Sequence, residues 1–234
     1  MTSELPGPAL DRVAVTGGAS GLGAAVIRAV RKRGGTAVAL DRQQPADDGP
    51  WVEVDLADPA AAEQALATAE EQIGPLTGVV TAAGIDACGR LTDVDLDDWV
   101  RVIQVNLIGT ATVARAAIPR LERTHGRIVT VASTLGLRAL SDATAYCASK
   151  FGVVGFSRAL AVETAGRVGV TMLVPGGMQT AFFDGRPDQY KPGPDAVLND
   201  PDNVADAVAY ALGQPPGVEI RELVVCPSTE PSWP

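Results

Sequence analysis

The stretch RVAVTGGASGLG, residues 12–23, contains the features that decide the fold. A short β-branched run typical of a buried strand leads into a glycine turn, and an alanine-rich segment predicted to be helical follows. Gly17, Gly21 and Gly23 let the backbone turn sharply and approach a ligand where a side chain would collide. The N-terminus of the next helix then offers unpaired N–H groups to a diphosphate. A glycine turn alone is weak evidence, but its place at the first strand–helix junction makes it specific.

The rest of the chain repeats this alternation of short strands and longer helices, which predicts an α/β protein with a largely parallel sheet. Further strands are predicted at 36–40, 51–54, 76–82, 127–132, 170–174 and 221–226, and helices at 22–33, 58–72, 96–123, 143–165 and 201–212. We find no repeat or dividing linker, so we expect one domain over residues 1–234. A Gly-, Pro- and Asp-rich loop at about 181–199 is long enough to indicate a functional segment.

Composition and charge narrow the class of protein. A formal net charge of −9, without a basic block, argues against binding to the phosphate backbone of a nucleic acid. Cys88, Cys147 and Cys226 have no CxxC spacing and predict reduced thiols, with no metal site. Residues 1–8 lack the features of a signal peptide, and the apolar runs are too short for a membrane span. We therefore expect a cytoplasmic protein without membrane contact.

Asp41 is the second mark of a dinucleotide site, because it follows the second strand about 20 residues after the glycine turn. A carboxylate there can accept both ribose hydroxyls of adenosine and would repel a 2′-phosphate. Ala19 and Ser20 in the turn offer no positive charge to that phosphate, so NAD is expected. Arg42 directly follows Asp41 and leaves NADP possible. The plainer alternative is that Asp41 is only a solvated acid at the end of a strand.

Tyr146 and Lys150 are four residues apart, so on a helix they lie on one face about one turn apart. A nearby ammonium is expected to lower the pKa of the phenol and so fit it for proton exchange with an alcohol or a carbonyl. Such a pair is commonplace on helix surfaces. Ser133 favours a catalytic pair over an ordinary pair on a helix surface. It directly follows the fifth strand, and the carboxyl ends of parallel strands gather at the ligand crevice.

Together these residues resemble the short-chain dehydrogenase/reductase family. TGGASGLG matches its cofactor turn, YCASK matches its Tyr-x-x-x-Lys element, and Ser133 lies thirteen residues before Tyr146 as the family pattern requires. The resemblance makes Asn106, in VNLIGT, the helix asparagine that holds Lys150 through a water in a proton relay. It assigns the adenine contact to Asp55 and Leu56, and the nicotinamide and diphosphate contacts to Pro175, Gly176 and Thr180. With the residues already considered, the expected cofactor contacts are Gly17, Ser20, Gly21, Leu22, Gly23, Asp41, Arg42, Asp55, Leu56, Ala82, Ala83, Gly84, Tyr146, Lys150, Pro175, Gly176 and Thr180.

The chain departs from the family pattern after the fourth strand, where Asn-Ala-Ala-Gly is replaced by Thr81-Ala82-Ala83-Gly84. We expect the Thr81 hydroxyl to replace part of the asparagine's hydrogen bonding. In the loop beyond the sixth strand, the cations Arg186 and Lys191 either meet an acidic group of the substrate or are simply solvated. Arg138, between Ser133 and Tyr146, has the same two interpretations.

The family resemblance implies a single Rossmann-type, doubly wound domain with strand order 3-2-1-4-5-6-7. It implies hydride transfer between NAD(H) and a secondary alcohol or ketone, with Asn106, Ser133, Tyr146 and Lys150 as the catalytic relay. An NADP-dependent ketone or 3-oxoacyl reductase is the chief alternative, and a non-catalytic dinucleotide-binding sensor is a second. The resemblance also implies a homotetramer or homodimer joined through the helices at 96–123 and 143–165. The substrate cannot be read from the sequence.

Overall fold

Seven strands pair in parallel in the order β3-β2-β1-β4-β5-β6-β7, so the predicted order is confirmed and the sheet is parallel throughout. The computed structural model describes residues 10–230, and the expectation about residues 1–8 lies outside this range. The strands are β1 (Arg12–Thr16), β2 (Thr36–Asp41), β3 (Trp51–Glu53), β4 (Gly78–Thr81), β5 (Arg127–Val131), β6 (Gly169–Pro175) and β7 (Glu222–Val225). The predicted strand at 76–82 is therefore shorter than expected.

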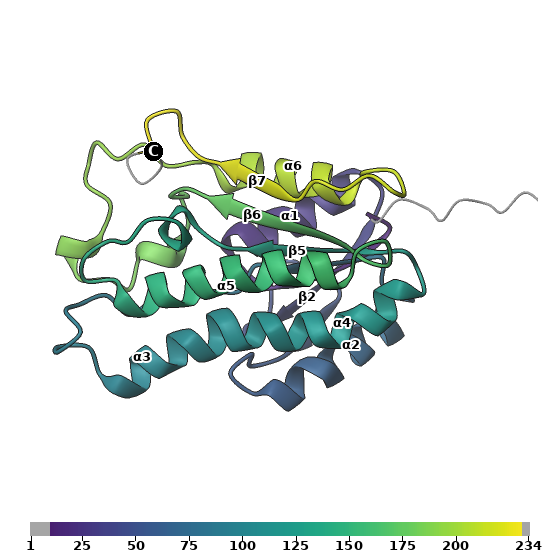
Figure 1. Cartoon of the computed structure of the whole chain (residues 1–234), viewed down its shortest axis with the longest axis horizontal. Helices are drawn as coiled ribbons and strands as arrows, with labels where there is room; N and C mark the ends of the chain where they lie inside the picture. Colours follow the sequence, from purple (N-terminus) through teal and green to yellow (C-terminus); the bar gives the residue numbers. More distant parts are fainter. Residues whose placement is uncertain (1–9, 231–234) are drawn as a thin grey trace, which may run out of the picture.

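Helices cover both faces of the sheet (Figure 1). The first face carries α1 (Gly21–Lys32) and α6 (Pro201–Leu212), and the second carries α2 (Pro59–Ile73), α4 (Thr110–Glu122) and α5 (Thr144–Glu163). The strands are buried on both sides, so their alternate residues enter two separate cores. In β1, Val13 and Val15 pack toward α1 and α6, whereas Ala14 belongs to the opposite core.

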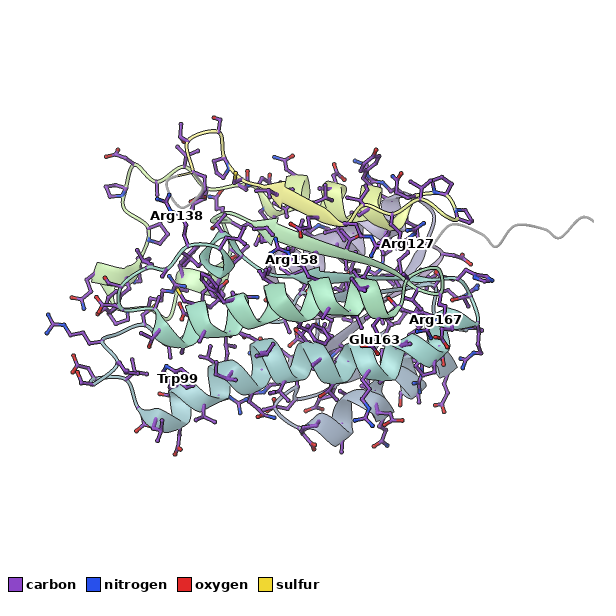
Figure 2. The ribbon with its side chains drawn as sticks, in the orientation of Figure 1. Trp99, Arg127, Arg138, Arg158, Glu163 and Arg167 are labelled. Carbon is purple, nitrogen blue, oxygen red and sulfur yellow. The ribbon has the colours of Figure 1, made fainter. Side chains whose placement is uncertain are left out.

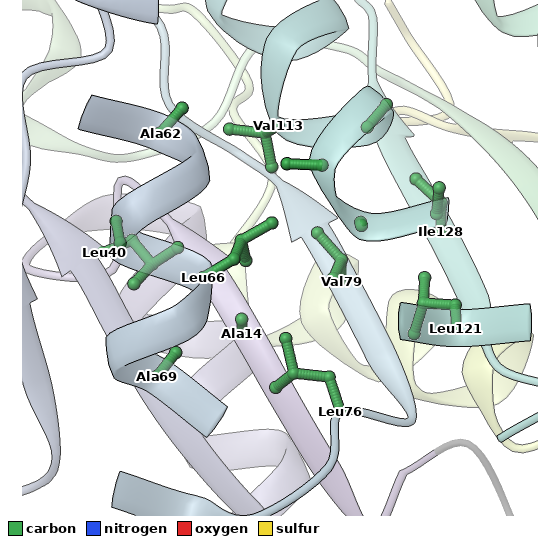
Figure 3. Packing of buried hydrophobic residues seen from close by; sticks show 14 of the residues in the cluster. Ala14, Leu40, Ala62, Leu66, Ala69, Leu76, Val79, Val113, Leu121 and Ile128 are labelled. Carbon is green, nitrogen blue, oxygen red and sulfur yellow. The ribbon is translucent and has the colours of Figure 1, made fainter. Parts of the chain in front are cut away.

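The second core shows why small residues are frequent in the helices. Leu66 from α2 packs over Leu40 and Val79 of the sheet, beside Ala62 and Ala69 of its own helix (Figure 3). Alanines on the inner face let the helix approach the strands, and the leucine between them fills the remaining space. Asp58 accepts a hydrogen bond from the Ala60 amide at 2.9 Å and begins α2, as its position before Pro59 predicted.

The helix predicted at 96–123 is a continuous run with an irregular centre. Helix α3 (Leu96–Ile103) leads into the π-helical turn η1 (Gln104–Gly109), which leads into α4. This run, Leu96–Glu122, is 27 residues long and contains an 18-residue stretch with a mean hydropathy of 1.2, enough in length and composition to cross a bilayer; half of that stretch is buried inside the fold, as in a core helix. The π-helical turn is the important feature, because Asn106 lies in it.

The connections that follow β4, β5 and β6 gather at the carboxyl ends of the strands, toward which the arrowheads of β6 and β7 point in Figure 1. The loop predicted at 181–199 contains two short 3-10 turns, η3 (Ala181–Phe183) and η4 (Asp188–Tyr190). Its base is closed where the Gln179 amide donates to the Asn199 carbonyl at 2.8 Å. The loop is therefore anchored at both ends beside the sheet.

Candidate active site

A cavity of about 800 Å³ lies at the carboxyl ends of the strands, and it divides into two halves. All of the expected cofactor contacts lie along its wall. We call the end formed by the glycine turn, Asp41 and Asp55 the cofactor half. The end formed by residues 135–140 and the loop 178–192 is the substrate half, and Ser133, Tyr146 and Lys150 lie where the two meet.

The glycine turn packs directly on the segment that follows β4. Gly17 has a φ of +66°, and a Cβ there would come within 2.8 Å of the Ala83 Cα. The Ala83 amide in turn donates to Thr16 Oγ1 at 3.1 Å. Ser20 is the N-cap residue of α1, but its side chain makes no capping hydrogen bond. The amides and the hydroxyl at this helix terminus therefore suit the diphosphate of a dinucleotide.

Carboxylates define the adenosine end of the cofactor half. Asp41 accepts hydrogen bonds from the amides of Ala19 and Gln43, each at 3.0 Å, so it is fixed to the glycine turn. Asp55 pairs with Arg101 at 3.0 Å and with Arg42 at 3.6 Å. Burial raises the pKa of Asp55, but the hydrogen bonds to its carboxylate and the two arginines outweigh this and lower it. Asp55 therefore stays ionised and draws Arg42 toward itself.

The expectation for Thr81 is wrong. Its hydroxyl is buried, and Thr81 Oγ1 has no hydrogen-bond partner among the described residues. The connection to the neighbouring strand is made through Thr16 Oγ1 and the Ala83 amide instead. A threonine side chain is too short to cross to the next strand as an asparagine amide can, so the Thr16 hydroxyl makes this contact from the neighbouring strand.

Ser133, from the turn after β5, comes together with Tyr146 and Lys150, which both lie in α5. Ser133 is the N-cap of the 3-10 turn η2 (Thr134–Gly136), and its Oγ accepts the Leu135 amide at 3.1 Å. Tyr146 lies in the first turn of α5 and shares a hydrogen bond with the Ser133 side chain. Lys150 is buried and donates through Nζ to the Val131 carbonyl at 2.9 Å. Its Nζ lies 5.6 Å from the centroid of the Tyr146 ring.

Burial dominates the acid–base properties of this group. It raises the pKa of Tyr146 to about 12, against the lowering effect of the Ser133 hydrogen bond. It lowers the pKa of Lys150 to about 8. The phenol pKa is therefore raised in this structure, where the sequence predicted a lowered one. Removing a charged group from water disfavours its charged form, and spacing along a helix carries no information about that cost.

Asn106 lies behind the site and holds the segment after β4. Its Oδ1 accepts the Ile85 amide at 2.8 Å, and its Nδ2 donates to the Ile85 carbonyl at 2.9 Å and to Ser149 Oγ at 3.0 Å. A Cβ on Gly84 would contact both Asn106 Oδ1 and Lys150 Nζ, at 3.6 and 3.7 Å. Asn106 and Lys150 therefore face the same glycine, and the structure shows no direct hydrogen bond between them among the described residues.

Comparisons with known proteins agree with this arrangement. The profile of the short chain dehydrogenase family matches residues 11–191. An uncharacterized oxidoreductase of Staphylococcus aureus (strain N315) is 32% identical over 230 residues, which cover 93% of this chain and 97% of that protein. The chain belongs to the short-chain dehydrogenase family.

Solved structures of the family superpose over most of the chain. The aldohexose dehydrogenase of Thermoplasma acidophilum has a TM-score of 0.82 at 24% identity and covers 92% of each chain, which shows a shared fold. A variant of the actinorhodin polyketide ketoreductase, solved with NADPH, has a TM-score of 0.82 at 27% identity and covers 94% of this chain and 97% of that one. The protein is therefore an oxidoreductase with a Rossmann-type dinucleotide-binding fold.

The substrate half of this short-chain dehydrogenase contains a contact that the sequence did not predict. Arg186, in the loop after β6, pairs with Asp86, which follows β4, at 2.6 Å. Lys191 pairs with Asp188 at 2.7 Å. Neither loop cation is therefore simply solvated. Arg138 also lies at this end of the sheet, and Arg127 and Arg167 lie at the other end (Figure 2).

Two residues that hold side chains of the site in place, Asp86 and Arg101, were missed by sequence reasoning, and both had a usable signal. Asp86 is an acidic residue shortly after the carboxyl end of a parallel strand, where ligand-binding groups concentrate. Arg101 lies one turn before Val105 on the helix that carries Asn106, and both Arg101 and Val105 line the cofactor half. Their partners, Asp86 for Arg186 and Asp55 for Arg101, are far away in sequence and are visible only in the fold.

Proposed function

We propose that this protein is an NAD-dependent oxidoreductase that interconverts a secondary alcohol and a ketone. The observation that carries the proposal is the meeting of Ser133, Tyr146 and Lys150 at the junction of the two halves of one cavity. The glycine turn and Asp41 lie on one side of this junction, and a loop with aromatic side chains lies on the other. A dinucleotide and a small organic molecule would therefore meet beside Tyr146.

Each of the three side chains has a distinct task. Tyr146 gives its proton to the carbonyl oxygen during reduction and takes it from the alcohol during oxidation. Ser133 orients the same oxygen from its position at the N-terminus of η2. The Lys150 ammonium, held by the Val131 carbonyl, stabilises the phenolate and faces the ribose position. When bound, the nicotinamide supplies or accepts the hydride at the neighbouring carbon.

Asn106 has a supporting task in this proposal. It is fully buried and fixes the backbone of Ile85 on both its N–H and C=O sides. That holds Gly84 against Lys150 and so keeps the floor of the site in place. Asn106 thus supports the proposed relay through the segment that carries Gly84, without a direct hydrogen bond to Lys150 among the described residues.

The proposal of NAD as the cofactor rests on Asp41. Its carboxylate is tied to the amide of Ala19, and a 2′-phosphate placed there would meet a fixed negative charge. Arg42 is the group that would receive such a phosphate, but it pairs with Asp55. NADP stays the alternative, because the related polyketide ketoreductase was solved with NADPH. Binding titrations with NADH and NADPH test this choice; tighter binding of NADPH would contradict it.

The catalytic assignment is tested with purified protein, NAD and a panel of secondary alcohols. We expect Tyr146→Phe to lower kcat by about 100-fold or more, the usual contribution of a general acid–base, while NADH affinity stays unchanged. Tyr210→Phe is the matched control, because Tyr210 lies exposed on α6 outside the cavity. Equal turnover in Tyr146→Phe would reject the mechanism. Cofactor binding without turnover in the wild type would support the alternative of a non-catalytic dinucleotide-binding sensor.

We also propose a homodimer or homotetramer joined through η1, α4 and α5. Ile108 and Phe151 are exposed apolar side chains on these helices, and a Cβ on Gly155 would meet open space. Phe151→Glu is expected to reduce the mass measured by light scattering after gel filtration. An unchanged mass would reject this surface. We also propose that the protein acts in the cytoplasm on a small molecule and binds neither nucleic acid nor a membrane.

A further inference from the structure

The strongest feature that the proposed reaction does not use is the ion pair between Asp86 and Arg186. It joins two connections that are 100 residues apart in the sequence, at a distance of 2.6 Å. The Asp86 side chain is 6% exposed and the Arg186 side chain 17% exposed, so water screens the pair little. The other ion pair of the loop, Asp188 with Lys191, is different, because Asp188 is 96% exposed.

Arg186 is also the centre of an aromatic cluster. Its guanidinium lies 4.9 Å from the centroid of the Phe182 ring and 4.6 Å from that of Phe183. Phe182 lies 5.6 Å from the Tyr146 ring. A cation stacked on aromatic faces stabilises them in one orientation, and the planar guanidinium suits this better than an ammonium would. A continuous set of contacts therefore runs from Asp86 through Arg186 and Phe182 to Tyr146.

We propose that the Asp86–Arg186 ion pair positions Phe182 beside Tyr146, and that Phe182 is a specificity-determining residue that receives an uncharged, apolar substituent of the substrate. This inference rests on the proposed function of the site. Asp86 and Arg186 are positioning residues, because they act on the substrate through the aromatic ring that they hold.

The charges of the substrate half support this class of substituent. Arg186 is engaged by Asp86 and by two aromatic faces, and Lys191 is paired with Asp188. Apolar side chains supply much of the remaining wall, namely Leu135, Leu140, Met178, Phe182 and Phe183. An anionic substituent that paired with Arg186 would have to displace Asp86 from a buried ion pair, whereas an apolar one gains contact with the rings and loses only water.

The pair also has an electrostatic effect on the reacting phenol. Asp86 raises the pKa of Tyr146 and Arg186 lowers it, so the two charges act on the phenol in opposite directions. The other groups that act on the phenol are Ser133, through its hydrogen bond, and the Cys147 thiol on the same helix. Lys150 lies 5.6 Å from the Tyr146 ring. Removing the charge of Asp86 and removing the charge of Arg186 should therefore shift the pKa of Tyr146 in opposite directions. Loss of structure alone would not do this.

The first experiment needs no turnover. Chymotrypsin cleaves after aromatic residues, and the positioned loop offers Phe182, Phe183 and Tyr190. We expect Asp86→Asn to speed cleavage in this loop about tenfold, which corresponds to loss of one charged hydrogen bond. Asp188→Asn is the matched control, with the same substitution on the exposed pair, and is expected to leave the rate unchanged. Equal rates in wild type and Asp86→Asn would overturn the positioning role.

The second experiment measures kcat/KM for alcohol oxidation against pH. Oxidation requires the Tyr146 phenolate, so the rate rises with pH. We expect Arg186→Gln to move the midpoint up and Asp86→Asn to move it down. The midpoint of the double variant Asp86→Asn/Arg186→Gln should lie between those of the two single variants. Shifts in the same direction, or no shift, would overturn the pair's action on the phenol.

The third experiment compares 1-phenylethanol with 3-hydroxybutyrate, and Phe182→Ala with wild type. We expect the apolar alcohol to have the higher kcat/KM in wild type, and Phe182→Ala to raise its KM about tenfold with little change in kcat. A preference for the anionic alcohol would overturn the substrate class while leaving the proposed function intact. If neither alcohol nor any other of the panel is oxidised, the proposed function fails, and the chymotrypsin result still decides the positioning role.

Discussion

The two halves of the cavity are built in different ways. In the cofactor half, the glycine turn, Asp41 and the segment 82–84 are placed by the ends of adjacent strands, and hydrogen bonds such as that from the Ala83 amide to Thr16 Oγ1 complete it. In the substrate half, two loops meet through one buried ion pair and an aromatic cluster. The first half depends on local geometry that the sheet imposes. The second depends on a few long-range side-chain contacts, so substitutions should damage the two halves separately.

The largest effect is expected where one side of the buried ion pair is removed. Arg186→Gln leaves the Asp86 carboxylate without its partner, and this should lower the free energy of unfolding by about 3 kcal/mol. Lys191→Gln, the control from the exposed pair, should change it by less than about 0.5 kcal/mol. Urea unfolding at neutral pH measures both. NADH affinity should be unchanged in both variants, and a parallel loss of affinity would break the separation of the halves.

Gly17→Ala tests the opposite half. Its φ of +66° is unfavourable for alanine, and the new Cβ would collide with Ala83. We expect NADH to bind about 100-fold more weakly, because backbone strain and displacement of the turn both reduce its affinity. Fluorescence titration measures this affinity. Gly193→Ala is a suitable control, since a Cβ there meets open space. Chymotrypsin resistance of the substrate loop should persist in both variants, and its loss in Gly17→Ala would show that the halves are coupled.

Tyr146 lies between the halves, and its titration reports on both. Burial disfavours the phenolate, so the pKa is expected at about 12, where an ordinary tyrosine has 10.0. In the free protein at pH 10, the tyrosinate absorbance should therefore be nearly the same in wild type and Tyr146→Phe. Since the folded-state pKa exceeds the unfolded one, the stability that Tyr146 contributes below pH 10 is lost as pH rises toward 12. A clear absorbance difference between the two proteins at pH 10 would contradict the burial argument.

The smallest effect concerns two threonines that are paired across β4 and β5. The Thr81 hydroxyl is buried and has no hydrogen-bond partner within residues 10–230, whereas Thr130 Oγ1 lies 2.6 Å from Ser157 Oγ. Thr81→Val should raise the free energy of unfolding by about 1 kcal/mol, and Thr130→Val should lower it by a similar amount. Urea unfolding compares the matched pair. Destabilisation by Thr81→Val would mean that the hydroxyl serves the cofactor half after all.

The sequence predicted most of the cofactor half because its elements are short, contiguous motifs. A glycine turn between a strand and a helix, and an acid at the end of the next strand, are placed by the parallel sheet whatever the rest of the chain does. Prediction failed where a property depends on surroundings. Thr81 was expected to form a hydrogen bond, and its hydroxyl has no partner among the described residues. Tyr146 was expected to have a lowered pKa, yet burial raises it.

The sequence by itself thus determined the alternation of elements and, through the family that its motifs resemble, the strand order and the expected cofactor contacts that line the cavity. Periodicity and motif spacing carry that information, because each strand and helix buries its own apolar face. Only the tertiary structure decided which charges neutralise each other, above all Asp86 with Arg186, and which side chains lose water. Pairing across 100 residues and desolvation are properties of packed space, and no local pattern along the chain encodes them.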